Sequence, residues 1–344
     1  MLNLFWIAVP KFDEQGACAC FLPGNAQADR VIRSLTGRDP AQSTGDATKP
    51  TKLFLMRMAE DMHQRSFVRD PRYDELATLG RAVYAAADPF PHAVFDDFVP
   101  PELLDAVLAE FDASMSFATI RFDDPKSLKL ATKGDEGLQP TLRAVLQEFG
   151  SPAFLGFLES LTGISGVIPD PYLEGAGLHQ IPRGGFLKIH ADFNRHPKLN
   201  VERRLNLLLY LNRNWQEEYG GHLELWDKTM TRCVHRILPV FNRCVIFNTT
   251  DDAFHGHPEP LTCPDGVSRK SIALYYYTCG CAAREAVPSH TTLFQVRPAD
   301  KARMETLGYR LRAGAANLLE SSASLAHKPA KLLRVIAEKI RPRY

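Results

Sequence analysis

Histidine and aspartate residues with metal-ligand spacing give the sequence its clearest capacity for chemistry. His190 and Asp192 are separated by one residue, and residues two apart on a β-strand point to the same face. A third ligand must come from another segment, and DDAFHGHPEP supplies His255 or His257. Two imidazoles and one carboxylate on one side of a metal ion leave its other coordination positions open. The spacing therefore predicts a metal site that can still accept further molecules.

An arginine and a tyrosine extend this group. Arg269 begins RKSIALYYYT, fourteen residues after His255, and a guanidinium offers two parallel donors that match a carboxylate. Tyr210 lies in RLNLLLYLN, where period-2 alternation puts Asn206, Leu208 and Tyr210 on one face. The tyrosine hydroxyl can donate a hydrogen bond to the same carboxylate. Because an open site of two histidines and one carboxylate is the ligand set of non-haem Fe(II) oxygenases, these residues predict an iron site beside a carboxylate-binding position.

The elements that must position these side chains change character near residue 174. Upstream, apolar spacing near 3.6 predicts helices, with one strand between them. The helical ranges are 53–85, 102–111, 138–150 and 151–163, and the strand lies within 88–99. Downstream, the period changes to 2 and predicts eight short strands separated by turns. Their ranges are 177–183, 185–192, 204–212, 221–227, 235–240, 243–249, 253–257 and 269–278. We expect an α+β fold whose core is an antiparallel barrel or jelly roll.

The stretch from His179 to Thr278 resembles the 2-oxoglutarate (2OG)- and Fe(II)-dependent dioxygenases, in particular the prolyl 4-hydroxylase-like branch. The motifs that carry the resemblance are H-A-D (190–192), RRLNLLLYLN (203–212), W-x4-GGHLELW (215–226), FNRCVIFNT (241–249), FHGHP (254–258) and RKSIALYYYT (269–278). The resemblance extends over roughly residues 88–282. It implies a double-stranded β-helix, or jelly-roll, core with flanking helices.

Carried over residue by residue, the resemblance makes His190, Asp192 and His255 the iron ligands. In related sequences the third ligand follows an aromatic residue and precedes a glycine or an acidic residue, as His255 does. His257 stays a competing candidate, because Arg269 follows it by the more usual twelve residues.

The resemblance also implies how the rest of the site is used. Arg269 is expected to pair with the distal carboxylate of 2OG, and Tyr210 and Asn206 to contribute to co-substrate binding. No catalytic side chain is predicted beyond the metal centre. The residues expected to line the substrate pocket are His179, His257 and Tyr275.

The implied activity is hydroxylation of a C–H bond with Fe(II), 2OG and dioxygen, with ascorbate as an additional reductant. The substrate class stays open between a prolyl residue of a protein and a small metabolite such as an amino acid, sugar or natural product. A non-catalytic metal-binding jelly roll is a second class of function. A cupin-type isomerase or zinc hydrolase shares the barrel but does not explain Arg269 and Tyr210 together.

The amino-acid composition limits the classes of protein to which the chain can belong. The chain has 344 residues, of which 45% are hydrophobic and 24% charged, with a net charge of +1; these values are typical of a soluble globular protein and do not indicate nucleic-acid binding. There is no apolar run long enough for a transmembrane helix, and MLNLFWIAVPKF lacks the features of a secretory signal. Seven cysteines without a CxxC motif favour a reducing compartment, and we expect a cytoplasmic protein. Two C-x-C pairs leave a four-thiolate metal site as a remote alternative.

Three regions are predicted along the chain. Residues 1–85 form an N-terminal extension with a linker and helices, residues 86–283 the dioxygenase domain, and residues 284–344 a helical C-terminal extension. Between Lys328 and Tyr344 stand six basic side chains against Glu338 alone. This tail is expected to be a solvated helical cap, with contact to an acidic partner or a membrane surface as the alternative. The oligomeric state is left open.

Overall fold

The structure is a computed structural model that describes residues 66–117, 119–279 and 288–301 in full. For residues 11–12, 18–19 and 302–304 it describes the backbone, and it also describes Leu318. The chain divides into two compact units, Met1–Pro50 and Thr51–Tyr344. In the first unit, β1 (Lys11–Phe12) pairs with β2 (Cys18–Ala19). The predicted regional boundaries at 85/86 and 283/284 stay predictions, and the basic tail lies outside the described residues.

Four α-helices precede the strand-rich part of the second unit. They are α3 (Arg72–Ala86), α4 (Pro101–Phe117), α5 (Pro140–Glu148) and α6 (Pro152–Thr162), with a 3-10 turn, η1 (Phe67–Arg69), before them. The expected start of α6 is confirmed: the Ser151 hydroxyl accepts the Phe154 N–H at 3.2 Å, and Pro152 follows as the first helical residue. Gly163 ends the helix at φ 73°, a conformation that glycine adopts without steric cost.

The strands form one thirteen-stranded sheet in which every pairing is antiparallel. Its central order is β11-β10-β13-β8-β5-β7-β14-β9-β12-β3, and β15, β4 and β6 pair with β8, β5 and β14. Their bounds are β3 (His92–Phe95), β4 (Thr119–Asp124), β5 (Ser127–Thr132), β6 (Val167–Pro169), β7 (Gly177–Pro182), β8 (Phe186–Ala191), β9 (Val201–Tyr210), β10 (Leu223–Trp226), β11 (Cys233–Ile237), β12 (Cys244–Asn248), β13 (His255–His257), β14 (Ser268–Cys279) and β15 (Leu293–Phe294). The 3-10 turn η2 (Glu217–Tyr219) and helix α7 (Pro298–Met304) complete the described elements.

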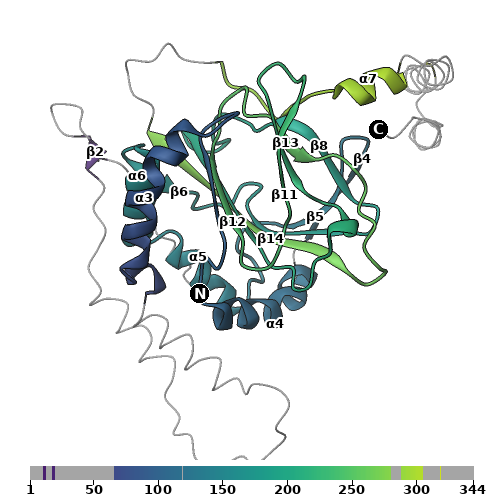
Figure 1. Cartoon of the computed structure of the whole chain (residues 1–344). Coiled ribbons are helices and arrows are strands. Elements are labelled where there is room, and N and C mark those ends of the chain that lie inside the picture. Colours follow the sequence, from purple (N-terminus) through teal and green to yellow (C-terminus); the bar gives the residue numbers. More distant parts are fainter. Residues whose placement is uncertain are drawn as a thin grey trace, which may run out of the picture. The chain divides into compact units, whose positions relative to one another are not determined.

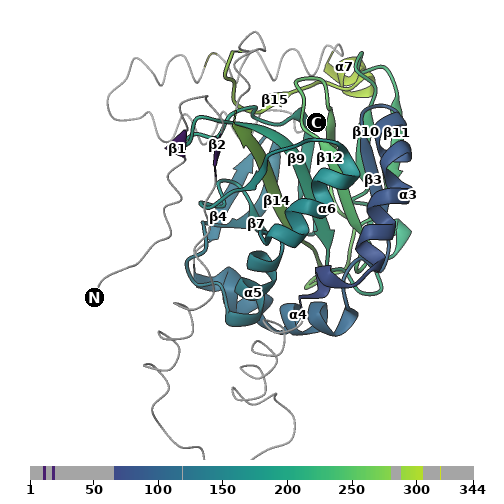
Figure 2. The same ribbon diagram turned by 90° about the vertical axis from the view of Figure 1, so that its left-hand side faces the viewer.

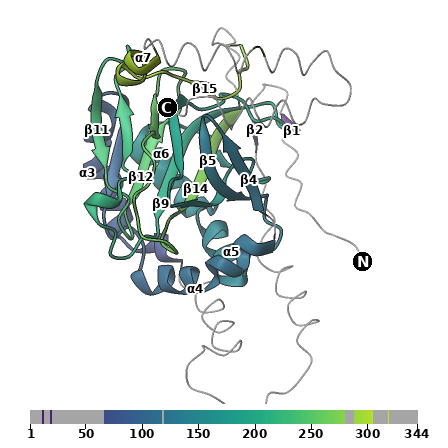
Figure 3. The ribbon, with the colours of Figure 1, turned by 90° about the vertical axis from the view of Figure 1, so that its right-hand side faces the viewer.

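The sheet has two halves that curl to face each other (Figures 1 and 3). Strand β5 joins them, because its first residues, Ser127 and Leu128, pair with β8 and its later residues, Leu130 and Ala131, pair with β7. Between the halves, Tyr210 and Phe247 pack in one apolar cluster with Leu223, Leu225 and Ile237. The predicted α+β fold with a double-stranded β-helix core is thereby confirmed, and all eight predicted strands from β7 to β14 are present.

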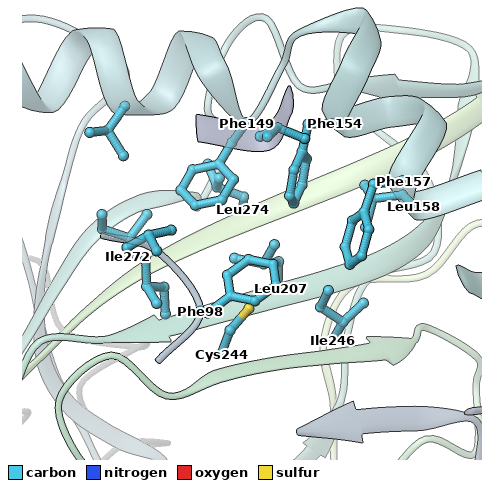
Figure 4. Packing of buried hydrophobic residues seen from close by; sticks show 14 of the residues in the cluster. Phe98, Phe149, Phe154, Phe157, Leu158, Leu207, Cys244, Ile246, Ile272 and Leu274 are labelled. Carbon is cyan, nitrogen blue, oxygen red and sulfur yellow. The ribbon is translucent and has the colours of Figure 1, made fainter. Parts of the chain in front are cut away.

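Helices cover the outer face of the half that contains β7, β14, β9 and β12. Figure 2 shows α3 and α6 in front of these strands. In Figure 4, the aromatic rings of Phe149, Phe154 and Phe157 lie over Leu274 and Leu207 of the sheet. Burying a side chain of this size stabilises the fold by about 1.5–3 kcal/mol, so this layer makes the site-bearing sheet rigid. No helix among the described residues is long and apolar enough to cross a membrane.

Candidate metal centre

His190, Asp192 and His255 converge inside the jelly roll. His190 and His255 are directly paired residues on the neighbouring strands β8 and β13, and their ring centroids are 4.5 Å apart. Asp192 follows β8 immediately. Its Oδ1 lies 3.5 Å from Nε2 of His190, and its Oδ2 lies 3.5 Å from Nε2 of His255. One ligand atom from each residue falls within 4.8 Å of the others, so the three can hold one metal ion.

Backbone carbonyls orient both imidazoles. Nδ1 of His190 lies 2.8 Å from the carbonyl oxygen of Lys188, and Nδ1 of His255 lies 2.9 Å from that of Ala253. A carbonyl oxygen only accepts, so each Nδ1 carries the hydrogen and each Nε2 keeps its lone pair for a metal. Burial lowers the pKa of His255 to about 4, although Asp192 opposes the shift. A neutral imidazole in this tautomer is the form that binds a metal.

Asp192 is kept ionised by two neighbours on β9. Nη2 of Arg203 donates to its Oδ2 at 2.9 Å, and Nδ2 of Asn206 donates to the same oxygen at 3.1 Å. Burial disfavours the charge, but the Arg203 guanidinium beside the carboxylate outweighs burial. The pKa of Asp192 therefore stands well below its ordinary value. Two imidazoles and one ionised carboxylate form a donor set that fits a divalent iron ion.

A β-bulge turns Arg203 toward the metal centre. Across β9 and β14, Leu205 pairs with Tyr276 but Arg203 pairs with Tyr277, so Arg204 is an extra residue in the strand. The guanidinium of Arg203 lies between two rings, 4.5 Å from the centroid of Phe193 and 3.5 Å from that of Tyr275. Nε and Nη1 of Arg203 have no partner among the described residues, so two buried donors remain available for a bound molecule.

Arg269 and Tyr210 form a second polar group on the same inner face. Nη2 of Arg269 donates to the Tyr210 hydroxyl at 3.1 Å, and Nε donates to the Gly221 carbonyl at 2.9 Å. Both side chains are buried, Arg269 with 4% and Tyr210 with 0% of its surface exposed. No acidic residue pairs with Arg269 among the described residues, so its charge is free to bind an anion. A Cβ on Gly221 would lie 3.0 Å from Cδ of Arg269, so a glycine here keeps room for the guanidinium.

The three residues predicted to line the pocket all lie on this inner face. Both ring nitrogens of His257 lack a partner among the described residues, and the ring is buried. Burial lowers the pKa of His257 well below its ordinary value, and Arg269 and Lys129 add to the effect. Nε2 of His179 lies 3.0 Å from the Gly175 carbonyl oxygen, to which Tyr275 also donates at 2.9 Å.

The structure thus brings together every residue that the sequence singled out, with one difference in detail. Asn206 contacts Asp192 rather than Arg269, so it belongs to the metal side of the pocket. Three cationic residues at the site were not foreseen: Lys129, Lys188 and Arg203. Arg203 was quoted only as part of a motif, and the bulge that directs it inward has no period-2 signal.

Two comparisons relate the chain to known proteins. The sequence profile of the 2OG-Fe(II) oxygenase superfamily matches residues 176–277, the segment from the start of β7 almost to the end of β14. This match confirms the resemblance stated from the motifs. No curated protein sequence matches the chain.

Among solved structures, similarity extends to several prolyl hydroxylases at low sequence identity. A Pseudomonas putida prolyl-4-hydroxylase is 20% identical with a TM-score of 0.41, covering 59% of this chain and 100% of that one. A Trichoplax adhaerens prolyl hydroxylase in complex with a hypoxia inducible factor peptide is 18% identical with a TM-score of 0.40, covering 67% and 96%. HygX from Streptomyces hygroscopicus, with nickel, 2-oxoglutarate and hygromycin B bound, is 12% identical with a TM-score of 0.40, covering 58% and 86%.

Proposed function

Because residues 176–277 belong to the 2OG-Fe(II) oxygenase superfamily, we propose that the protein is an Fe(II)- and 2OG-dependent dioxygenase that hydroxylates a C–H bond. The observation that carries the proposal is that two groups of residues lie on the same inner face of the jelly roll. One is the group of His190, Asp192 and His255, whose ligand atoms lie within 4.8 Å. The other is the buried pair of Arg269 and Tyr210, which has no acidic partner among the described residues.

The proposed roles follow from the donor set. His190, Asp192 and His255 hold the iron, and His255 is preferred to His257 because its Nε2 faces Asp192. Arg269 and Tyr210 bind the distal carboxylate of 2OG. When bound, iron and 2OG supply the oxidising power for hydroxylation with dioxygen. The chain's own residues orient the co-substrate, keep His255 neutral, hold Asp192 ionised and exclude water from a buried site.

Three further assignments are part of the proposal. The substrate is a prolyl residue of a protein or, alternatively, a small metabolite. Cys233, Cys244 and Cys263 are free thiols, which supports a reducing compartment such as the cytoplasm, with ascorbate as an additional reductant. The basic tail is proposed to stay solvated, with contact to an acidic partner or a membrane surface as the alternative, and no nucleic-acid partner is expected.

The deciding experiment measures 2OG binding and turnover in the same preparation. Titration calorimetry under anaerobic conditions with Fe(II) should show 2OG binding to the wild-type protein, and succinate should form when air is admitted. Arg269→Ala should lose both, because the distal carboxylate would be left without its cationic partner. Arg213→Ala is the matched control, since Arg213 pairs with Asp105 at the surface. Absence of 2OG binding in the wild type, or unchanged binding in Arg269→Ala, contradicts the proposal.

A further inference from the structure

Lys129 occupies the same row of the sheet as the proposed 2OG-binding arginine. On β5, Leu130 pairs with Gln180 and Ala131 with His179, which sets Lys129 opposite Ile181. On the other side of β7, Ile181 pairs with Arg269. Residues opposite each other in an antiparallel sheet share a face, so Lys129 and Arg269 both point into the jelly roll. Their backbones are two strand spacings apart, roughly 10 Å.

The ammonium group of Lys129 has no acidic partner among the described residues. It lies 5.0 Å from the ring centroid of Phe122, the residue opposite it on β4. The nearest acidic residue on the hairpin is Asp124, an exposed turn residue whose carboxylate accepts backbone N–H groups of Lys126 and Ser127. Burial, with help from the Arg203 and Arg269 charges, lowers the pKa of Lys129 to about 8. The group is therefore still mostly cationic at neutral pH, and it lacks a counter-ion.

The inner face as a whole carries an excess of positive charge. Among the described residues, Lys129, Lys188, Arg203 and Arg269 face it, whereas Asp192 is the carboxylate that lies at the proposed metal position. The charges of a bound Fe(II) ion and a bound 2OG dianion cancel each other, so the excess persists in the loaded site. Lys188 donates to the Pro258 carbonyl, Arg203 is engaged with Asp192 and Arg269 with the proposed co-substrate. Lys129 is the cation on this face with no such engagement in the described part of the chain.

From this placement we propose that the substrate is a small molecule whose own carboxylate binds Lys129. The inference rests on the proposed function and names its substrate class. Lys129 lies near His179, which pairs with Ala131 two residues further along β5. Burial, with the Lys129 charge as a smaller contribution, lowers the pKa values of His179 and His257, and His257 is two residues from the iron-facing His255. The bound carboxylate is therefore held close to the carbon that is oxidised. An internal prolyl residue of a protein has its carboxyl group in a peptide bond and offers no such charge, whereas a free amino acid or another small acid does.

The test compares fractions of a cell extract as stimulants of 2OG decarboxylation by the Fe(II)-loaded protein. The extract is separated into macromolecules, small molecules retained on an anion exchanger and small molecules that pass through it. We expect the retained fraction to stimulate succinate formation and to yield a product heavier by one oxygen atom. Stimulation confined to the macromolecular fraction or the unretained fraction overturns the inference, and so does the absence of stimulation by the retained fraction.

Substitutions in the β4–β5 hairpin test whether Lys129 is responsible for the stimulation of succinate formation. Lys129→Met should lower stimulation by the retained fraction about tenfold or more, the size expected for a lost charged hydrogen bond, and Lys129→Arg should restore part of it. Lys126→Met is the matched control, because Lys126 is exposed on the same hairpin. The affinity of Lys129→Met for 2OG should stay within about twofold of the wild type. Weaker 2OG binding would make Lys129 a co-substrate residue and overturn the inference, whereas failure of the wild type to bind 2OG would overturn the proposed function itself.

Discussion

Replacing Tyr210 by phenylalanine removes one oxygen atom from the proposed 2OG site and leaves the packing almost unchanged. The hydroxyl accepts a hydrogen bond from Nη2 of Arg269 at 3.1 Å, so its own hydrogen points elsewhere. No acceptor for that hydrogen is present among the described residues, and the residue is completely buried. A carboxylate held by Arg269 would supply the acceptor. Tyr210→Phe should therefore weaken 2OG binding specifically.

The expected size follows from the charge of the acceptor. A hydrogen bond to a charged group contributes about 1.5–3 kcal/mol, which corresponds to a roughly 10-fold to 140-fold increase in the dissociation constant of 2OG. Arg269 retains its bond to the Gly221 carbonyl, so its position should be preserved. Titration calorimetry of 2OG against anaerobic, Fe(II)-loaded protein measures the change directly.

Tyr276→Phe provides the matched control on the opposite face of β14. The Tyr276 hydroxyl donates to the Phe149 carbonyl at 3.0 Å in the helix-covered core. Its removal should destabilise the fold by about 1–3 kcal/mol, because a buried acceptor loses its partner, but it should leave the 2OG affinity within about twofold. Equal 2OG affinity in Tyr210→Phe and wild type would refute the reasoning, and an equal loss in both variants would show a general effect of unfolding.

Three further predictions concern the metal centre and its supporting strands. His255→Ala should lower Fe(II) affinity at least about 100-fold while His257→Ala keeps it within about threefold, measured by competition with a chelator; the reverse order would make His257 the ligand. Arg203→Met should weaken Fe(II) binding by about 10-fold to 100-fold. Because Asp192 then loses the charge that depresses its pKa, Fe(II) binding should be lost at a higher pH than in the wild type as the pH falls. Superimposable pH profiles of the variant and the wild type would contradict this. Gly256→Ala should lower stability by about 1–3 kcal/mol, since its Cβ would lie 2.8 Å from the Leu187 carbonyl oxygen, whereas Gly156→Ala, with no atom within 4 Å, should raise it by about 0.5–1 kcal/mol in thermal unfolding.

The strands of the core could be predicted because their sequences alternate. Of the eight segments from β7 to β14, all but β11 bury one or both faces, and period-2 patterning is strongest where one face meets a core. The inward orientation of Arg269 and Tyr275 follows from the same rule. Their proximity to Tyr210 and Arg203 required the pairing register, which depends on contacts between distant segments.

Two features of the structure could not be predicted from the periodicity of the sequence. The hairpin of β4 and β5 is largely exposed on β4, and TIRFDDPKSLKLAT alternates over only about four residues on each side of its turn, which is too short a run to mark a half-buried strand. Arg203 and Asn206 are three residues apart and would point to opposite faces of a regular strand, but the bulge at Arg204 turns both inward. A bulge results from the fit of one strand to its neighbours, so it is not encoded in local periodicity.

The pairing of β5 with both β8 and β7 has a consequence for the evolution of substrate selectivity in such an enzyme. Lys129 lies on a hairpin that ends well before the matched segment at 176–277, so the proposed discrimination between substrates and the oxidative machinery occupy separate stretches of the gene. In the described structure, strand pairing to Phe186, Leu187, His179 and Gln180 joins the two stretches, together with hydrogen bonds from Leu178 to Thr132 and from Lys188 to Lys126. Replacing this hairpin is therefore expected to change the substrate selectivity without changing the residues of the iron centre.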